Sequence, residues 1–493
     1  MTNTDTLDTK ASVEQCKKII DAGAEMVRLT TQGIREAENL EAIKRELRRS
    51  GYDAPLVADV HFNPAVAETA ARIVEKVRIN PGNYTDPRAL FRDGIQTDDQ
   101  FAEGFEKARE RFLPLIKICK QYGTAIRVGV NHGSLSDRIM MRYGNTPEGM
   151  ARSAIEFLAI LKDEGFANAV VSMKSSDPLV MVTATRLTVA MMQESVMEFP
   201  VHLGVTEAGE GEDGRILSAA GIGMLLAEGI GDTIRVSLSE APEDEIPVAR
   251  KIVSLFPGRT IIQGSYQSPA SRPAVEGFRH PVVLGENGSK NRSDLSLDQF
   301  NSKYSVSDAR IYSFNSPDDI SKATKFITDH YPLPVILNPR FTTSSLEELV
   351  IESGVTMGRF FIESMAAGLI IDAPAIKEKA LLTDLAFTIL QTTGARITRN
   401  RYLSCPTCGR TKFNLLEAVK KVKEATSHTK GLKIAVMGCV VNGPGEMAGA
   451  DWGYVGAGQG KVHIYKGLTP VMKNVPEDKA VEELVKLIED SSD

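Results

Sequence analysis

Short hydrophobic runs rich in β-branched residues alternate with amphipathic stretches from the start of the chain to about residue 255. The runs suit buried strands, whereas the stretches between them repeat apolar residues at helical spacing, and several end at a glycine. The predicted strands are residues 25–30, 55–62, 75–80, 124–131, 168–174, 200–207 and 232–238. The clearest predicted helices are residues 12–23, 105–123 and 149–165. This alternation predicts a parallel sheet covered by helices, close in size to an eight-stranded (β/α) TIM-type barrel of roughly 250 residues.

The pattern changes after residue 255, where a segment rich in proline and serine (264–281) precedes a polar one (285–300). A domain boundary is therefore predicted near this point. Further on, the predicted strands are 308–316, 334–338, 432–439 and 461–467, and the predicted helices are 344–354, 357–368, 413–428 and 477–490. We expect three α/β domains, at residues 1–256, 257–395 and 396–493.

Charged and polar residues stand near the carboxyl ends of all seven predicted barrel strands. They are Arg28, Asp59, His61, Arg78, Asn80, Arg127, Asn131, Ser172, Lys174, Glu207, Arg235 and Ser237. In a barrel these strand ends open on one face, where active sites are built. Four arginines, a lysine and a histidine would then meet at one mouth, which favours a small polyanion, and the forked guanidinium groups favour phosphate. An ion pair at the rim explains any single one of these charges equally well, but explains the whole set less well. The middle segment shows no comparable set, which favours a spacer domain.

Composition narrows the class of protein. With 42% hydrophobic and 25% charged residues, the chain resembles ordinary soluble proteins, and its net charge of −6 argues against a general nucleic-acid surface. No apolar run approaches the roughly 18 residues of a membrane span, and no signal peptide opens the chain, so a cytoplasmic location is expected. Thiols stay reduced there, and a close cysteine pair is then more typical of a metal or redox site than of a disulfide. Cys16 and Cys119 fall within predicted helices, where small buried hydrophobic residues are expected.

The other three cysteines lie near the C-terminus. Cys405 and Cys408 stand in "SCPTCGR", and Cys439 stands in "AVMGCVVNGPGEM". Taken alone, a CxxC turn is as typical of the knuckle of a zinc ribbon as of any other site. A zinc ribbon, however, needs a second CxxC pair or its His equivalent roughly 15–20 residues later. Only Cys439 follows, so three thiolates suit a metal or cluster that leaves one position for another ligand, which Glu446 can supply.

Nine motifs in order carry a resemblance to a known family. They are "MTNTDT", "ADVHF", "VRINPGN", "IRVGVNHGSL", "VSMKSSD", "GVTEAG", "DTIRVSL", "CPTCGR" and "AVMGCVVNGPGE". Together they resemble the 4-hydroxy-3-methylbut-2-enyl diphosphate synthase family, the iron-sulfur enzymes of the methylerythritol phosphate route to isoprenoids. The motifs leave out about 257–395, and that gap is similar to the long form of the family, where a second barrel-like domain separates the catalytic barrel from the cluster domain.

The resemblance implies a function and roles for individual residues. The implied reaction is the reductive ring opening and dehydration of 2-C-methyl-D-erythritol 2,4-cyclodiphosphate, with electrons from reduced flavodoxin or ferredoxin. The implied ligands of a 4Fe-4S cluster are Cys405, Cys408, Cys439 and Glu446. Glu207 would transfer protons, Asp59 would orient neighbouring groups, and the basic strand ends would bind the diphosphate.

Three further expectations concern the first barrel strand, an alternative function and the assembly of the site. In the family a strand ending in "VQSM" precedes "TNTDT", so the barrel is expected to lack its first strand. A phosphate-binding barrel lyase or binding protein with a structural zinc remains the alternative. A homodimer is possible, although we expect the middle domain to let the C-terminal domain fold over the barrel of its own chain.

Overall fold

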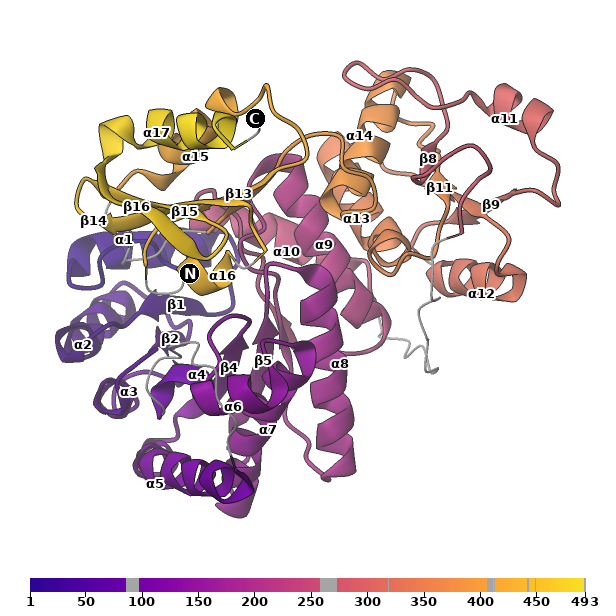
Figure 1. Ribbon diagram of the computed structural model, residues 1–493. Coiled ribbons are helices and arrows are strands. Elements are labelled where there is room, and N and C mark those ends of the chain that lie inside the picture. Colours follow the sequence, from indigo (N-terminus) through magenta and orange to yellow (C-terminus); the bar gives the residue numbers. More distant parts are fainter. Residues whose placement is uncertain are drawn as a thin grey trace.

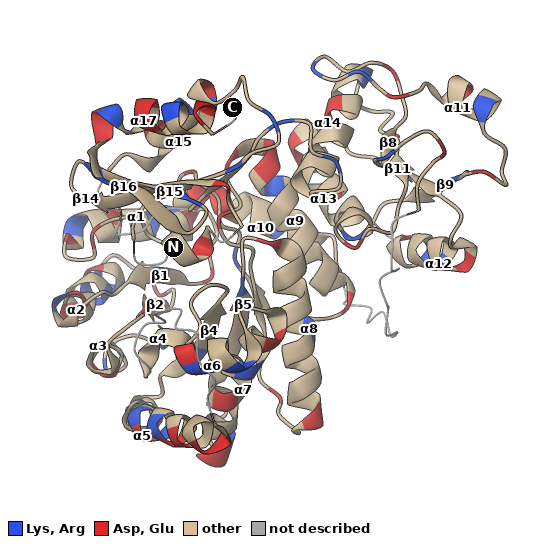
Figure 2. Cartoon of the chain, viewed as in Figure 1, with Lys and Arg blue, Asp and Glu red and all other residues tan. Residues whose placement is uncertain are grey.

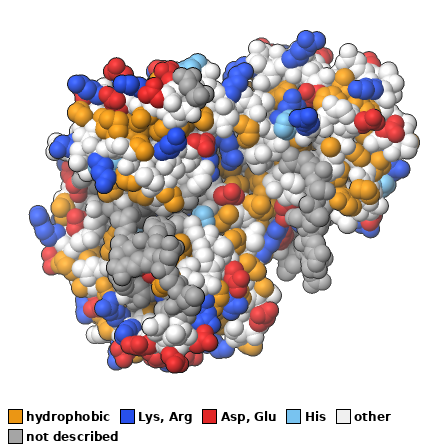
Figure 3. Space-filling view, viewed as in Figure 1, with side chains coloured by type: hydrophobic (Ala, Val, Ile, Leu, Met, Phe, Trp, Pro, Cys, Tyr) orange, Lys and Arg blue, Asp and Glu red, His pale blue; other side chains and the backbone are white. Residues whose placement is uncertain are grey.

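The computed structural model describes residues 1–85, 97–257, 273–317, 319–405, 411, 413–440, 443–447 and 449–491. Its three parts are the barrel, a middle domain that extends to one side, and a C-terminal domain above the barrel (Figure 1). The space-filling view shows the same three lobes (Figure 3). Outer helices such as α5 (Asp98–Tyr122) and α17 (Glu477–Glu489) carry many charged residues (Figure 2). Among the described residues, no helix combines the length and hydropathy that a membrane span requires.

Within the described part of the chain, seven parallel strands form the barrel, as the hydrophobic pattern predicted. Strands β1 to β5 pair in order, a bridge between Val171 and Val201 links β5 to β6, and β6 pairs with β7. The strands are β1 (Val27–Thr30), β2 (Leu56–Asp59), β3 (Lys76–Ile79), β4 (Ala125–Asn131), β5 (Ala169–Lys174), β6 (His202–Leu203) and β7 (Thr233–Ile234). Residues such as Leu29 and Ala58 are fully buried, because helices cover the outside of the parallel sheet.

Helices follow every barrel strand. They are α2 (Ile34–Arg49), α3 (Pro64–Ala70), α4 (Pro81–Tyr84), α5, α6 (Asp137–Tyr143), α7 (Pro147–Asp163), α8 (Pro178–Glu194), α9 (Gly211–Ala227), the 3₁₀ turn η1 (Pro242–Asp244) and α10 (Glu245–Ser254), with α1 (Thr9–Asp21) before β1. Among the described residues, no strand pairs with the outer edges of β1 and β7. The backbone N–H of Thr2 donates one hydrogen bond to Arg28 O of β1, at 3.0 Å.

Among the described residues of the middle domain, four parallel strands form one sheet in the order β8-β11-β10-β9. Its elements are β8 (Val282–Val283), β9 (Arg310–Asn315), β10 (Val335–Arg340), β11 (Gly368–Leu369), α11 (Leu297–Lys303), α12 (Ile320–His330), α13 (Leu346–Ile362) and α14 (Lys379–Thr392). The strand ends carry some charge after all, since Asp319, Arg340 and Asp372 line a shared cavity. This set is smaller than the one at the barrel mouth.

The prediction of two helices at 344–354 and 357–368 is wrong, because α13 runs unbroken through Gly354. This glycine serves close packing and does not end the helix. A Cβ at Gly354 would lie 2.9 Å from the Cβ of Ala219 in α9, and one at Gly358 would lie 2.3 Å from the Cβ of Ala220. Helices α9 and α13 therefore lie side by side and join the middle domain to the barrel (Figure 1).

In the C-terminal domain, the residues that the structure describes form a five-stranded sheet in the order β12 to β16, with parallel pairing up to β14 and antiparallel pairing after it. Its elements are β12 (Arg401–Ser404), α15 (Leu415–Ala425), β13 (Lys433–Met437), α16 (Gly443–Glu446), β14 (Trp452–Gly458), β15 (Lys461–Lys466), β16 (Thr469–Pro476) and α17. The four predicted elements of this region are confirmed, whereas β12, β14, β16 and the short α16 were not predicted.

Candidate active site

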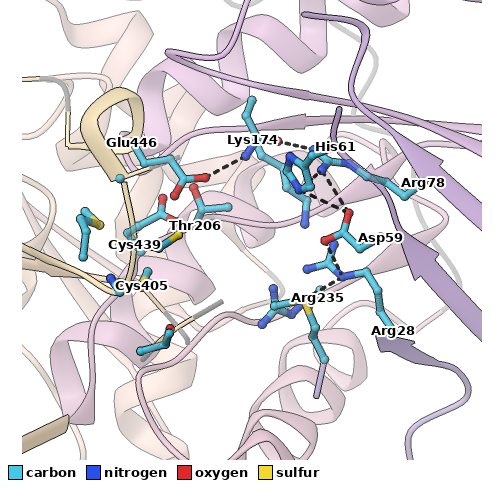
Figure 4. A pocket seen from close by; sticks show the side chains of 17 residues that line it. Arg28, Asp59, His61, Arg78, Lys174, Thr206, Arg235, Cys405, Cys439 and Glu446 are labelled. Atoms are coloured by element: carbon cyan, nitrogen blue, oxygen red, sulfur yellow. Dashed lines mark hydrogen bonds and ion pairs between the residues drawn. The ribbon is translucent and has the colours of Figure 1, made fainter. Parts of the chain in front are cut away.

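One cavity lies between the mouth of the barrel and the C-terminal domain (Figure 4). Most of the predicted site residues line it: Arg28, Asp59, His61, Arg78, Asn131, Lys174, Glu207 and Arg235 from the barrel, with Cys405, Cys439 and Glu446 from the C-terminal domain. Cys408 lies outside the described residues. The parallel strands thus bring a basic set to one edge, and the C-terminal domain places sulfur and carboxylate groups against it.

Four of the residues predicted at the strand ends are buried without lining this cavity: Asn80, Arg127, Ser172 and Ser237. Asn80 caps α4, because its Oδ1 accepts a hydrogen bond from the N–H of Gly82 at 3.2 Å. Arg127 comes four residues before the end of β4 and therefore lies deeper in the barrel. Burial lowers the pKa of Arg127 well below its ordinary value, and the positive charges of Arg28 and Arg78 lower it further.

A buried carboxylate organises two of the arginines at the mouth. Arg78 Nη1 donates to Asp59 Oδ1 at 3.1 Å, and Arg28 Nε lies 3.7 Å from Asp59 Oδ2. Arg78 also lies 2.8 Å from His61 Nε2 and donates to Asn131 Oδ1 at 2.5 Å. Burial alone would raise the pKa of Asp59, but the charges of Arg28 and Arg78 outweigh it and hold the pKa well below its ordinary value. Asp59 is therefore an ionised partner that holds these guanidinium groups in place.

Positive charge in the cavity exceeds what the neighbouring carboxylates balance. Burial lowers the pKa of Lys174 well below its ordinary value, and the charges of Arg28 and Arg127 act in the same direction. An anion that entered the cavity would relieve this repulsion. The arrangement is therefore suited to a small, highly charged anion such as a diphosphate.

Glu207 follows β6 in a strained backbone conformation, with φ of +52°. Positive φ is uncommon for residues other than glycine and costs of order 1–3 kcal/mol, and such strain gathers at functional sites. Burial raises the pKa of Glu207 well above its ordinary value, and the Glu446 carboxylate raises it further. The protonated form of Glu207 is favoured, which suits a group that gives up a proton.

The C-terminal domain reaches the barrel of its own chain through direct hydrogen bonds. Asn131 Nδ2 donates to Glu446 Oε1 at 3.0 Å, and Ser176 Oγ donates to the backbone oxygen of Glu446 at 3.2 Å. Ser239 Oγ donates to the backbone oxygen of Cys405 at 3.2 Å. The segments that carry Cys405 and Glu446 are thus both fastened to loops of the mouth.

Backbone also meets backbone at this contact, where a Cβ on Gly133 would lie 2.3 Å from the oxygen of Gly445. We expect Gly133→Ala to push the two domains apart and to lower turnover by roughly 10²-fold, since misplacement by about 1 Å can cost that much. Gly123 offers a matched control, because its φ is +71°, close to the +77° of Gly133, and nothing lies within 4 Å of its Cβ position. Steady-state assays of both variants test this, and equal losses would show that backbone strain, not domain contact, is responsible.

The donor set near the cysteines fits an iron-sulfur cluster. Cys405 Sγ accepts a hydrogen bond from the N–H of Gly438 at 3.2 Å, as cluster thiolates do, and a Cβ on Gly438 would lie 3.3 Å from that sulfur. Cys405, Cys439 and Glu446 line the same cavity, and thiolates are the usual ligands of iron-sulfur clusters.

Several cavity residues were not predicted: Met1, Thr206, Thr411, Met437, Gly438 and Gly443. Two of them adjoin predicted residues, since Thr206 precedes Glu207 and Gly438 precedes Cys439. All of them except Thr411 stand inside the motifs that carry the family resemblance, and Thr411 directly follows one, so the motifs were the available signal.

Fold and site together define a TIM-barrel protein whose basic mouth is covered by a cysteine-bearing α/β domain. The GcpE TIM-barrel domain matches residues 1–250, and the GcpE protein C-terminal domain matches residues 401–490. The chain belongs to the GcpE family.

Full-length relatives support this assignment. The chain is 44% identical to a 4-hydroxy-3-methylbut-2-en-1-yl diphosphate synthase (flavodoxin) of Phocaeicola vulgatus, over 100% of this chain and 94% of the relative. It is 44% identical to the protein of the same name from Bacteroides fragilis, covering 100% and 92%, and 39% identical to that of Akkermansia muciniphila, covering 99% and 92%. The first alignment spans 579 positions, more than the 493 residues of this chain, so the relative carries segments that this chain lacks.

Proposed function

We propose that this chain converts 2-C-methyl-D-erythritol 2,4-cyclodiphosphate to 4-hydroxy-3-methylbut-2-enyl diphosphate, with reduced flavodoxin as electron donor. The main support is that one cavity is lined by basic barrel residues on one side and by Cys405, Cys439 and Glu446 on the other. The names of the relatives agree with it, and the alternative with a structural zinc is not favoured.

The barrel residues bind and orient the substrate in this proposal. Arg28, Arg78, Lys174 and Arg235 take the diphosphate, and Asp59 keeps two of these arginines in place. Arg127 supports the anion from the deeper barrel interior, and His61 and Asn131 act as neutral groups around it, whereas Asn80 and Ser237 do not line the cavity. Guanidinium groups suit this task because each presents a rigid fork of donors to a phosphate.

A 4Fe-4S cluster held by Cys405, Cys408, Cys439 and Glu446 would supply two electrons, one at a time, beside the substrate. The overall change consumes two electrons and two protons, breaks the C–O bond that closes the ring and releases one water. Glu207 is the proton donor in this scheme, because it lines the cavity and its raised pKa keeps a proton available. The C-terminal domain also excludes water from the reacting atoms.

The zinc alternative and the iron-sulfur proposal differ in metal content. We expect anaerobically purified protein to be brown, with about four irons and four sulfides per chain. Metal analysis with an optical spectrum tests this. A colourless protein with one zinc per chain would overturn the proposal.

We propose that barrel (1–256), spacer (257–395) and cluster domain (396–493) complete the site within one chain. The contacts of Glu446 with Asn131 and Ser176 support this, as does the close packing of α9 against α13, which fixes the spacer to the barrel. The spacer then serves to return the cluster domain to its own barrel mouth.

Mixing two inactive variants tests the single-chain site. We expect Glu207→Gln and Cys439→Ser, co-expressed with different tags and purified through both, to stay inactive because neither chain holds a complete site. Turnover recovered to about a quarter or more of the wild-type value would show that cluster and barrel of different chains cooperate. Wild-type chains that carry the two tags serve as the control.

A further inference from the structure

One buried carboxylate does not line the cavity but contacts a basic residue that does. Glu245 begins α10, ten residues after Arg235, and is only 4% exposed. Neither the strand-end pattern nor the family motifs pointed to this residue. Its surroundings nevertheless connect it to the anion site.

Both carboxylate oxygens of Glu245 bind the same guanidinium. Arg235 Nη2 donates to Oε1 at 3.0 Å, and Arg235 Nε lies 3.3 Å from Oε2. The N–H of Leu238 also donates to Oε1 at 3.2 Å, and the amino group of Met1 lies 3.9 Å from Oε2. The backbone of the segment that carries Arg235 therefore fixes the carboxylate, which binds the guanidinium through Nε and Nη2.

Arg235 needs such a partner because it stands among like charges. It lines the cavity together with Arg28, Arg78 and Lys174. Repulsion from these groups would drive a flexible arginine side chain away from an empty mouth. Asp59 counters this for Arg28 and Arg78, whereas Glu245 does so for Arg235.

We propose that Glu245 is a positioning residue that presents the guanidinium of Arg235 to the diphosphate of the substrate. The inference rests on the proposed function, since it takes the cavity to bind a diphosphate. A held guanidinium loses less conformational freedom when the anion arrives, so Glu245 strengthens binding although it is itself negative.

The direction in which anion affinity changes when Glu245 is neutralised distinguishes positioning from simple charge balance. If Glu245 acted only through its charge, neutralising it would make the mouth more positive and would tighten anion binding. If it positions Arg235, neutralising it weakens binding. Glu245→Gln keeps the size of the side chain, but either orientation of its amide sets an NH₂ donor against N–H donors, because both oxygens of Glu245 accept bonds.

The test is calorimetric titration of the anaerobically purified holoenzyme with inorganic pyrophosphate. We expect Glu245→Gln to raise the dissociation constant at least tenfold, and to raise KM for the substrate more than it lowers kcat. In an Arg235→Gln background the same change should have less than a twofold effect, because no guanidinium is left to position. Tighter or unchanged binding of Glu245→Gln would overturn the proposal, as would an equal loss in both backgrounds.

A matched control lies outside the site. Glu240 accepts from Arg215 Nη1 and Nη2 at 2.7 and 3.0 Å and from the N–H of Gly211 at 2.7 Å, so it also binds one guanidinium and one backbone N–H, but away from the cavity. Glu240→Gln should bind pyrophosphate like the wild type.

A second variant serves if Glu245→Gln does not fold. Glu245→Asp keeps the charge but draws the carboxylate back from the guanidinium, so it should also weaken binding, and wild-type affinity would count against positioning. Failure of the proposed function looks different: the wild-type protein would then not bind pyrophosphate, and Arg235→Gln would change nothing.

Discussion

Replacing Cys439 by serine is expected to lower the iron content from about four atoms per chain to less than one and to abolish turnover. A serine oxygen is a harder ligand than a thiolate and holds iron-sulfur clusters poorly. Cys405→Ser and Cys408→Ser should behave in the same way. Iron and sulfide analysis of the anaerobically purified variants measures the effect.

Glu446→Ala is the informative counterpart. Its carboxylate is a weaker iron ligand than a thiolate, so the three cysteines should keep at least half of the iron while turnover is lost. The loss of turnover has a second cause, since Glu446 also joins the C-terminal domain to Asn131 at 3.0 Å. Equal loss of iron in all four variants would contradict the proposed role of Glu446 as a displaceable fourth ligand.

Glu207→Gln should lower turnover by roughly 10²- to 10⁴-fold, the usual contribution of a positioned acid, and should leave iron content and pyrophosphate affinity near the wild-type values. The amide keeps the shape of the side chain but has no acidic proton to give. Stopped assays under saturating substrate measure the change in kcat.

Glu212→Gln provides the control for that experiment, because Glu212 lies exposed five residues further along the chain. Its turnover should equal that of the wild type. A Glu207→Gln protein that keeps more than a tenth of wild-type turnover would remove Glu207 from proton transfer.

The barrel could be predicted from the sequence because its strands are buried on both faces and leave short, continuous apolar runs. Strand β16 gave no such signal. Its exposed residues include Lys473, and prolines stand at 470 and 476, features that protect an edge strand and that read as a loop in the sequence. The prediction that a helix ends at Gly354 was wrong because the sequence does not distinguish a glycine that ends a helix from one that allows a neighbouring helix to pack closely.

For the site, the rule of strand ends found the right face of the barrel but not the depth of each side chain. Asn131 lines the cavity, whereas Arg127, on the same strand and the same side, lies below it. Glu245 was not predicted as a site residue because it lies on a helix and not at a strand end. Only the fold brings it into contact with Arg235. Partners of this kind are set by tertiary packing, which no local pattern records.

The most direct measurement is a single anaerobic reaction of the purified wild-type chain with 2-C-methyl-D-erythritol 2,4-cyclodiphosphate and reduced flavodoxin, followed by ³¹P NMR. We expect the cyclic diphosphate to disappear, 4-hydroxy-3-methylbut-2-enyl diphosphate to appear in equal amount, and two electrons to be consumed for each molecule formed. Protein that holds its full complement of iron and binds pyrophosphate, yet leaves the cyclic diphosphate unchanged, would contradict the proposed function.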